Sequence, residues 1–299
     1  MEPNPVLKKL GFSDSDRLVI LHTDDIGMCQ ASVQAYIDLW EFGGISSGAI
    51  MMPCPWAKTA AEYCRTHPGV DMGVHATLTA EWDLYRWSPL STRDSASGLM
   101  DADGFLWRSS EEAQKHADPE AALEELQLQV RRAAAWGVDI THVDTHMGTV
   151  AHPKLIPAYL QAAMQAGVPV MIPRGDVSIY QHMGVDAESA AGMAAFTRQL
   201  EEQGLPLVDA LVSMPLDQPE GQIAIARKLL GGLTAGVTHF IFHPSIDSPE
   251  LRRICPDWPS RVANYQTFMS QEIKDFIRNE GIQVIGYRHL KTLIQGAAA

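Results

Sequence analysis

The sequence predicts an α/β protein in which eight parallel strands alternate with helices, a TIM-barrel-like (β/α)₈ barrel that is either regular or distorted. Short runs of β-branched and apolar residues, bounded by Gly, Pro or Asp, alternate with helical patterns along the chain. Strict alternation implies helical crossovers between parallel strands, and eight repeats favour a barrel over an open doubly wound sheet. No GxGxxG or GxxxxGK(S/T) motif follows the first run, which counts against the nucleotide-binding form of the open sheet.

Eight short apolar runs are the predicted strands, and helical patterns separate them. The strands are expected at 18–25, 45–51, 70–78, 140–146, 169–174, 207–214, 238–244 and 282–288. The helices are expected within 31–43, 55–64, 118–137, 152–167, 187–204, 221–232 and 261–281. Several of these helical patterns close on Gly, the usual residue at a helix end, and 118–137 opens on a capping Asp followed by Pro.

One connection, 79–117, runs for nearly forty residues without a clear helix or strand. Loops of this length inside a compact domain are usually functional or disordered. The connection holds Trp82, Tyr85, Trp87 and Trp107. Such side chains either stack against sugar rings or form a lid over a site, or they anchor the loop onto the barrel. We therefore expect one domain, 1–299, with 79–117 as a long insertion over the site.

Composition and charge narrow the class of protein. The chain is 46% hydrophobic and 20% charged, as is typical of a globular enzyme. Its net charge is −13 and its Lys and Arg residues form no cluster, so the electrostatic footprint of a nucleic-acid-binding protein is missing. An acidic chain also favours a neutral or amine-bearing small-molecule substrate over an anionic one.

The start of the chain and the pattern of cysteines predict the cellular compartment. The first twenty residues lack an apolar leader core, and no run approaches the ~18 apolar residues of a membrane span. We expect a cytoplasmic protein with no membrane partner, and a homo-oligomer is left open. The four cysteines, Cys29, Cys54, Cys64 and Cys255, form no CxxC pair and are expected to be reduced and partly buried.

Histidine and aspartate gather where the predicted strands end, which is where barrel enzymes place their catalytic groups. These residues are His22, Asp24, Asp25, His75, His142, Asp144, His146, His239 and His243. Because alternate residues of a strand share a face, His142, Asp144 and His146 point the same way. Such polar groups on a buried strand are costly unless they are paired, hydrated or bound to metal. A lone strand histidine is usually a satisfied core residue, but four such strands together favour a site.

Two histidines and one carboxylate, with a coordination position left for water, form a recurrent hydrolytic metal site. A bound divalent ion lowers the pKa of that water and polarises the carbonyl under attack. The adjacent Asp24 and Asp25 suit such a site, because one carboxylate can bind the metal while its neighbour acts as a base. The alternative is that the pair caps a turn or a helix, since Gly27 follows and a helix is expected to start near Cys29.

Four short motifs follow one another along the chain. They are Leu21–Gly27 (LHTDDIG), Gly73–His75 (GVH), Thr141–His146 (THVDTH) and His243-Pro244. In this order they resemble the motifs of the YdjC-like carbohydrate deacetylases, which include chitooligosaccharide deacetylases. The resemblance runs from the first strand through residue 245, and it is the ordered set rather than any one motif that is specific.

The resemblance implies a role for each residue that matches the family's pattern. Asp25, His75 and His146 would bind one divalent metal ion, zinc or magnesium. Asp24 would be the general base and His243 the general acid. The implied fold is a distorted (β/α) barrel. The implied enzyme is a metal-dependent hydrolase that removes the acetyl group from an N-acetylated sugar or oligosaccharide.

Other polar residues near these motifs have less defined roles. His22, His142 and Asp144 would orient the ligands and tune the base, with Asp144 as an alternative metal ligand. Three arginines are left out of the catalytic set, because a surface ion pair explains each of them nearly as well as a contact with substrate or with a carboxylate. They are Arg174, Arg253 and Arg261.

Departures from the family's pattern bear on the substrate. Residues 147–149 stand between His146 and His152, where the family continues with further histidines. The third strand reads GVHATL instead of GVHLNL, and 242–245 reads Phe-His-Pro-Ser instead of Cys-His-Pro-Gly. Three other interpretations remain: a barrel hydrolase or isomerase for another small molecule, a non-catalytic sugar-binding protein, and a purely structural His and Asp cluster.

Overall fold

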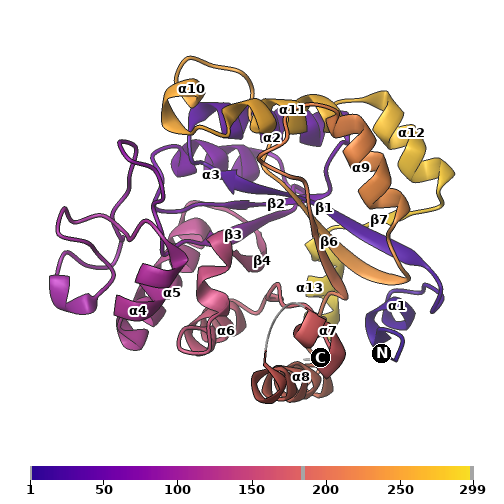
Figure 1. Cartoon of the computed structure of the whole chain (residues 1–299), viewed down its shortest axis with the longest axis horizontal. Coiled ribbons are helices and arrows are strands. Elements are labelled where there is room, and N and C mark those ends of the chain that lie inside the picture. The colour runs from indigo at the N-terminus through magenta and orange to yellow at the C-terminus, as the bar shows by residue number, and fades with distance from the viewer. Residues whose placement is uncertain (1, 183–185, 297–299) are drawn as a thin grey trace.

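The centre of the fold is β1 (Arg17–Ile26), a strand that pairs in parallel with neighbours on both sides. The strand order is β4-β3-β2-β1-β6-β5, with β7 added beside the start of β1. The other strands are β2 (Ser47–Ile50), β3 (Met72–Ala76), β4 (Ile140–Thr145), β5 (Ala210–Ser213), β6 (Gly236–Phe242) and β7 (Gln283–Val284). The computed structural model describes residues 2–182 and 186–296, and Figure 1 shows the strands surrounded by helices.

The predicted barrel is present in its distorted form, because no continuous ladder joins β4 to β5 among the described residues. The segment 169–174, predicted as a full strand, bridges this gap with two isolated parallel pairs. Val170 pairs with Val143 of β4, and Pro173 pairs with Val208 just before β5. Pro169 and Pro173 lack the N–H groups that a ladder needs, which explains why this strand does not form in full.

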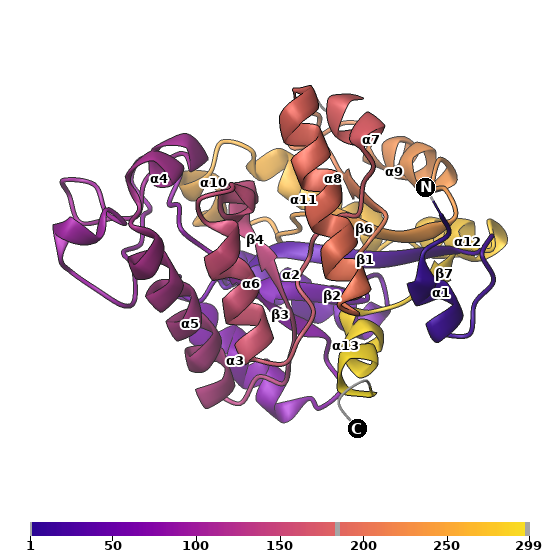
Figure 2. The same ribbon diagram turned by 90° about the horizontal axis from the view of Figure 1, so that it is seen from below.

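The helices follow the predicted alternation. On the N-terminal side are α1 (Pro5–Lys9), α2 (Gln30–Phe42), α3 (Ala57–Thr66), α4 (Ser110–His116), α5 (Pro119–Ala135) and α6 (Ile156–Gln165). Later in the chain are α7 (Val177–His182), α8 (Ala187–Glu202), α9 (Gln222–Gly231), α10 (Leu251–Ile254), α11 (Trp258–Phe268), α12 (Gln271–Asn279) and α13 (Tyr287–Gly296). Two 3₁₀ turns are Ser95–Ser97 and His146–Ala151. Figure 2 shows α5 and α6 side by side, and they pack along β3 and β4.

Local chemistry explains several helix ends. Asp118 accepts hydrogen bonds from the backbone N–H groups of Glu120 and Ala121, and Pro119 follows it at the first turn of α5. The pattern predicted at 261–281 is divided, because Ser270 caps a new helix by accepting from the N–H of Glu272. Among the described residues, no helix is long and apolar enough to cross a membrane. All four cysteines are free and buried, as predicted.

The long connection 79–117 is anchored by its aromatic residues. Trp82 and Trp87 are only 8% and 4% exposed and belong to the main apolar core. Trp87 Nε1 donates to the backbone oxygen of Thr79, and Trp107 Nε1 donates to that of Gly98. Instead of lacking structure, the connection contains one 3₁₀ turn and α4. The burial of Trp82 and Trp87 and the hydrogen bonds of Trp87 and Trp107 fit the interpretation that these tryptophans anchor the connection onto the barrel.

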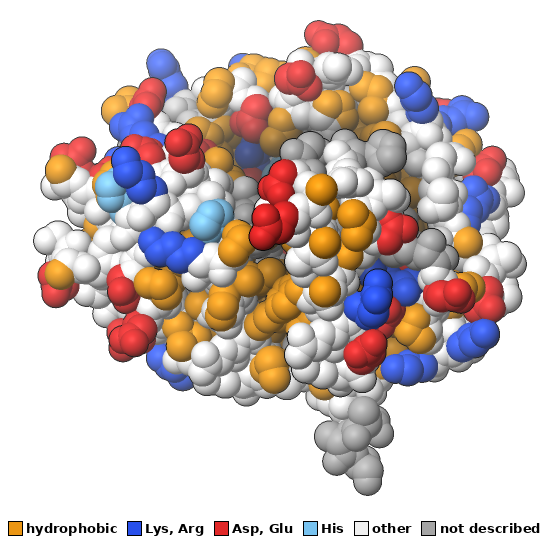
Figure 3. All heavy atoms as spheres, turned by 60° about the horizontal axis from the view of Figure 1, so that its bottom comes forward, with side chains coloured by type: hydrophobic (Ala, Val, Ile, Leu, Met, Phe, Trp, Pro, Cys, Tyr) orange, Lys and Arg blue, Asp and Glu red, His pale blue; other side chains and the backbone are white. Residues whose placement is uncertain are grey.

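Charged side chains of both signs share the molecular surface. On the face in Figure 3, lysines and arginines are scattered among acidic and hydrophobic side chains and form no continuous basic stripe.

Candidate metal centre

Five side chains predicted from the sequence meet at the carboxyl ends of the strands. Asp24 and Asp25 lie near the end of β1, His75 in β3, His146 directly after β4, and His243 directly after β6. Asp25 Oδ1 lies 3.6 Å from His75 Nε2 and 3.2 Å from His146 Nδ1. Asp24 Oδ2 lies 3.7 Å from His75 Nε2 and 3.8 Å from His243 Nε2. The fold therefore brings together the whole set that the sequence indicated.

An irregularity in β1 lets two consecutive carboxylates reach the same place. Successive side chains of a regular strand point to opposite faces, yet Asp24 and Asp25 both approach His75. The register between β1 and β2 shifts between Thr23 and Ile26, and Asp25 adopts a left-handed conformation with φ 60°. Asp tolerates this conformation better than most residues, and such conformations concentrate at functional sites. Sequence periodicity alone does not reveal this turn of the backbone.

Gly27 leaves room for the irregular end of β1. Its φ is 88°, and a Cβ added there would lie 2.9 Å from Ala57 Cα at the start of α3. Any larger residue would push β1 away from α3 and displace the preceding carboxylates. Gly27 is therefore required by the backbone, and the capping alternative for the Asp pair does not describe their contacts.

Asp25, His75 and His146 offer one free ligand atom each. Each of these three residues uses its second polar atom on a protein partner: Asp25 Oδ2 accepts from Arg261 Nη1 at 2.7 Å. His75 Nδ1 lies 2.8 Å from Asp144 Oδ1, and His146 Nε2 lies 3.0 Å from Glu81 Oε2. These outer partners are of the kind that orient metal ligands.

The remaining three atoms, Asp25 Oδ1, His75 Nε2 and His146 Nδ1, lie close to one another. Asp25 Oδ1 is buried and has no hydrogen-bond partner among the described residues. It faces the two free imidazole nitrogens, and the three atoms lie within 4.8 Å of one another. One carboxylate oxygen and two imidazole nitrogens at this spacing form a set of ligands that fits a divalent cation. An unpaired buried carboxylate oxygen is costly, and a cation would remove that cost.

The electrostatic field of the centre also favours a cation. Burial opposes a charge on the His146 ring, but Glu81 and Asp25 together raise its pKa to about 10. Burial likewise opposes ionisation of Asp25, but the charge of Arg261 and the contact with His146 hold its pKa well below the usual range. The carboxylates of Asp25 and Glu81 thus favour a positive charge on the His146 ring that lies between them. A metal ion bound to His146 would take the place of the ring proton on the side of Asp25.

The two groups outside this trio differ in their environments. Burial would raise the pKa of Asp24, but the charge of His75 and the hydrogen bond to His22 lower it below its ordinary value. Burial lowers the pKa of His243, and the nearby carboxylates of Asp25 and Asp24 oppose this effect only in part. Asp24 is therefore an ionised proton acceptor beside an imidazole that gives up its proton readily.

The structure assigns contacts to residues whose roles the sequence left open. Asp144, considered as an alternative ligand, holds His75 through Oδ1. Arg174 instead forms ion pairs with Asp209 and Glu201. Arg253 is exposed.

Sequence reasoning did not assign two members of the centre. Arg261 of α11 is 3% exposed and binds Asp25, which is the carboxylate contact that the sequence left open beside a substrate contact and a surface ion pair. Glu81 was not singled out and lies in the long connection, where it contacts His146. Neither residue belongs to a strand end, so the pattern that revealed the other five did not include them.

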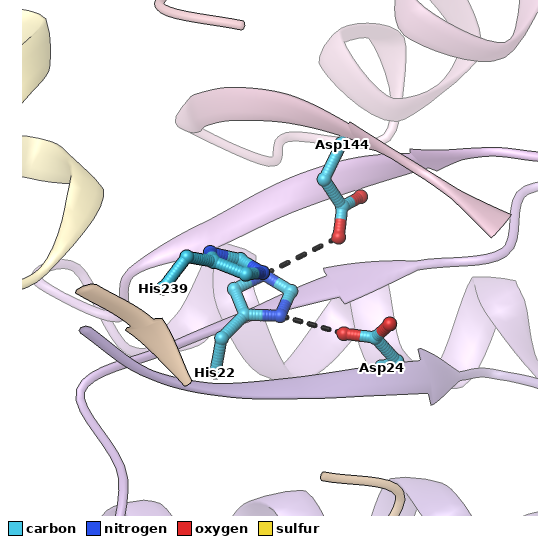
Figure 4. Close-up of side chains that lie close together, drawn as sticks. All are labelled: His22, Asp24, Asp144 and His239. Carbon is cyan, nitrogen blue, oxygen red and sulfur yellow. Dashed lines mark hydrogen bonds and ion pairs between the residues drawn. The ribbon is translucent and has the colours of Figure 1, made fainter. Parts of the chain in front are cut away.

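A second buried cluster lies directly behind the first and shares Asp24 with it. Its members, drawn in Figure 4, are His22, Asp24, Asp144 and His239. His22 Nδ1 lies 2.8 Å from Asp24 Oδ1, and His22 Nε2 lies 3.6 Å from Asp144 Oδ2. The cluster therefore links Asp24 to Asp144, the residue that orients His75.

Comparison with known proteins places this architecture in a family. The family model described as YdjC-like protein matches residues 18–279. A carbohydrate deacetylase of Thermus thermophilus is 31% identical over 269 residues, which cover 90% of this chain and 92% of the relative. A carbohydrate deacetylase of Thermoanaerobacter pseudethanolicus is 25% identical over 278 residues, covering 92% and 100% of the two chains.

A solved structure shows the same fold. It comes from Enterococcus faecalis, is provisionally described as a cellobiose-phosphate cleavage protein, and is 20% identical to this chain with a TM-score of 0.73. The match covers 92% of this chain and 99% of the other. The family match over most of the chain, together with the motif residues assembled at the strand ends, shows that the protein belongs to the YdjC-like family.

Proposed function

We propose that the protein is a metal-dependent carbohydrate deacetylase that hydrolyses the acetamide group of an N-acetylated sugar or oligosaccharide. The observation that carries the proposal is the arrangement of two free functional groups, Asp24 and His243, beside a three-residue set of metal ligands. Its support from relatives is that proteins similar over nine-tenths of this chain are named carbohydrate deacetylases.

The residues that would hold the metal are Asp25, His75 and His146. When bound there, a divalent ion would polarise the acetyl carbonyl and lower the pKa of the attacking water. Two of the three ligands are imidazoles, a set that suits zinc better than magnesium, which prefers oxygen ligands. We therefore expect zinc to support activity better than magnesium.

Asp24 is the proposed general base. Its Oδ1 is engaged by His22, while its Oδ2 faces His75 and His243 and is the oxygen available to a water molecule in the centre. Because its pKa lies below the ordinary value, Asp24 is ionised at neutral pH and can take the proton that the water loses as its oxygen bonds to the acetyl carbon.

His243 is the proposed general acid. The C–N bond of the acetamide breaks only when the departing nitrogen receives a proton, because an amide anion is a very poor leaving group. His243 Nε2 lies 3.8 Å from Asp24 Oδ2. In its protonated form, which the carboxylates of Asp25 and Asp24 favour, His243 would donate that proton and become neutral. Its backbone N–H donates to Asn264 Oδ1, which holds the backbone of His243 just after the end of β6.

The test is the release of acetate. Protein stripped with a chelator and reloaded with Zn²⁺ or Mg²⁺ is incubated with N-acetylglucosamine, its short oligosaccharides and other N-acetylated sugars. The proposal expects acetate and a free amine in equal amounts with at least one substrate, and no product after stripping. Equal activity before and after stripping, or no acetate from any member of the panel, would contradict it.

A further inference from the structure

The side chain of His22, at the middle of β1, is fully buried, and both of its ring nitrogens lie within hydrogen-bond distance of another side chain. Nδ1 lies 2.8 Å from Asp24 Oδ1, and Nε2 lies 2.9 Å from His142 Nε2. Between two imidazole nitrogens one must carry a proton and the other must be bare. The protonation of His22 can therefore be worked out from the other contacts of His142.

The direction of hydrogen bonding starts at Asp71. Its oxygens accept from the hydroxyls of Ser47 and Thr141, at 2.8 and 2.7 Å, and from the backbone N–H of Arg288 at 2.7 Å. A hydroxyl has a single proton, and Thr141 donates its proton to Asp71. In the 3.0 Å contact between Thr141 Oγ1 and His142 Nδ1, the hydroxyl oxygen must then accept, and His142 Nδ1 carries a proton.

His142 has only this one ring proton. The ring is fully buried and stacks on Tyr287 with 3.8 Å between the ring centroids. Burial holds the pKa of His142 well below its ordinary value, so the ring is neutral. With its proton on Nδ1, His142 Nε2 is an acceptor.

It follows that both nitrogens of His22 donate. Nε2 donates to His142, and Nδ1 donates to the carboxylate of Asp24. We propose that His22 carries a proton on both ring nitrogens, and that its charge and hydrogen bond position Asp24 for its role as the base. His22 is a positioning residue here, and this step rests on the proposed function.

The surroundings of His22 suit a cation. Two carboxylates face it: Asp24, and Asp144, whose Oδ2 lies 3.6 Å from Nε2 (Figure 4). The third group, His239 of β6, has its ring centroid 4.5 Å away and is neutral, because burial holds its pKa well below the ordinary value. The hydroxyl of Tyr287 lies 2.9 Å from His239 Nδ1. Burial opposes a charge on the His75 ring, but Asp144 and Asp24 raise its pKa, so His75 shares these two carboxylates with His22.

The consequence for Asp24 is geometric. With Oδ1 held by a charged donor, only Oδ2 is left toward the metal centre, where it faces His75 and His243. The four residues of Figure 4 could also be considered as a second metal site. However, both nitrogens of His22 are already used in hydrogen bonds, so a metal ion there would have to break one of them.

Ring-nitrogen NMR of ¹⁵N-histidine-labelled protein with added Zn²⁺ tests the inference. At pH 8, His22, assigned by the loss of its signals in His22→Asn, is expected to carry protons on both nitrogens, and His142 on Nδ1 alone. A singly protonated His22 in the wild type would overturn the proposal. Binding of a second Zn²⁺ that removes a His22 proton would overturn it in favour of a metal site.

Two hydroxyl variants test the chain of donors. Thr141→Val removes the acceptor that fixes the His142 tautomer, so the His22 ring-nitrogen signals at pH 8 should shift toward those of a singly protonated ring. Ser47→Ala removes a neighbouring hydroxyl from the same Asp71 oxygen without touching His142, and should cause no such shift. Equal behaviour of the two variants would contradict the inference.

The same design separates this inference from the proposed function. His22→Asn retains a neutral donor but not the charge, and kcat should fall roughly 10- to 100-fold, with KM and bound metal unchanged. Wild-type kcat in this variant would overturn the positioning role. If no acetylated sugar is hydrolysed at all, the proposed function fails, while the NMR result still decides the protonation of His22.

Discussion

Arg261 of α11 reaches the end of β1 and places its Nη1 2.7 Å from Asp25 Oδ2. Both side chains are almost fully buried, and Asp257 holds the other edge of the guanidinium through Nε at 3.0 Å. The pair leaves Asp25 with one free oxygen, which is the oxygen directed at His75 and His146. A helix far along the chain thus determines which atom of a strand-end carboxylate is offered to a metal.

Replacing Arg261 should weaken metal binding. In Arg261→Met, Asp25 keeps its charge but loses the partner that fixes it, and metal affinity should fall roughly 10- to 100-fold, as for other groups that orient ligands. The free energy of unfolding should also fall by about 3–5 kcal/mol, because a buried carboxylate is left unpaired. Competition with a chelator gives the affinity, and denaturant titration gives the stability.

A matched control is Arg252→Met. Arg252 also pairs with an aspartate, Asp247, but its side chain is 52% exposed, so metal affinity and stability should stay close to the wild type. Equal metal affinity in the two variants would show that Arg261 does not orient Asp25.

His239 should make the protein less stable in acid. In the unfolded chain it titrates near its ordinary pKa of about 6.5, whereas burial holds its folded-state pKa well below that. Below about pH 6.5 the unfolded state therefore binds more protons, and stability is lost as pH falls. This one group steepens the loss by up to about 1.4 kcal/mol per pH unit.

His239→Gln should flatten that slope. Unfolding free energies from denaturant titrations between pH 6.5 and 4.5 provide the comparison. His67→Gln, at the exposed end of α3, serves as the control and should keep the wild-type slope. A His239→Gln slope equal to that of the wild type would mean that the buried ring accepts a proton in the folded state.

The part of the long connection nearest to the centre should contact the substrate. Leu84 is 97% exposed, and it lies three residues after Glu81, which contacts His146. A single exposed apolar side chain is common on a protein surface, so it is the position of Leu84 close to Glu81 that indicates the contact. Leu84→Ser should raise KM for an oligosaccharide several-fold and leave kcat and stability unchanged. Met164→Ser, an exposed apolar residue on α6, should change none of these quantities, and an identical KM in both variants would count against the contact.

How far the sequence predicts this molecule depends on the residue. His75, His146 and the Asp24-Asp25 pair were recognisable because parallel strands end at one edge of a barrel, so polar residues at strand ends must meet. The strand expected at 169–174 was wrong for a reason already visible in Pro169 and Pro173, whose missing N–H groups break a ladder. Pattern matching placed the segment correctly but overestimated its pairing.

The remaining features depend on tertiary contacts. Arg261 and Glu81 join the centre from a helix and from a long connection, neither of which carries a strand-end signal. The left-handed turn at Asp25 depends on the packing of Gly27 against Ala57. The proton on His22 follows from a donor chain that links β1, β4 and Asp71. None of these contacts leaves a periodic pattern in the sequence.

The most direct test of the proposed chemistry measures bound metal and acetate release in the same samples of Asp24→Asn and His146→Ala. Asp24→Asn should retain one metal ion per chain and lose roughly a hundred- to ten-thousand-fold in kcat, because only the proton acceptor is removed. His146→Ala should lose the metal and with it the activity. Full turnover with metal retained in both variants would contradict the account.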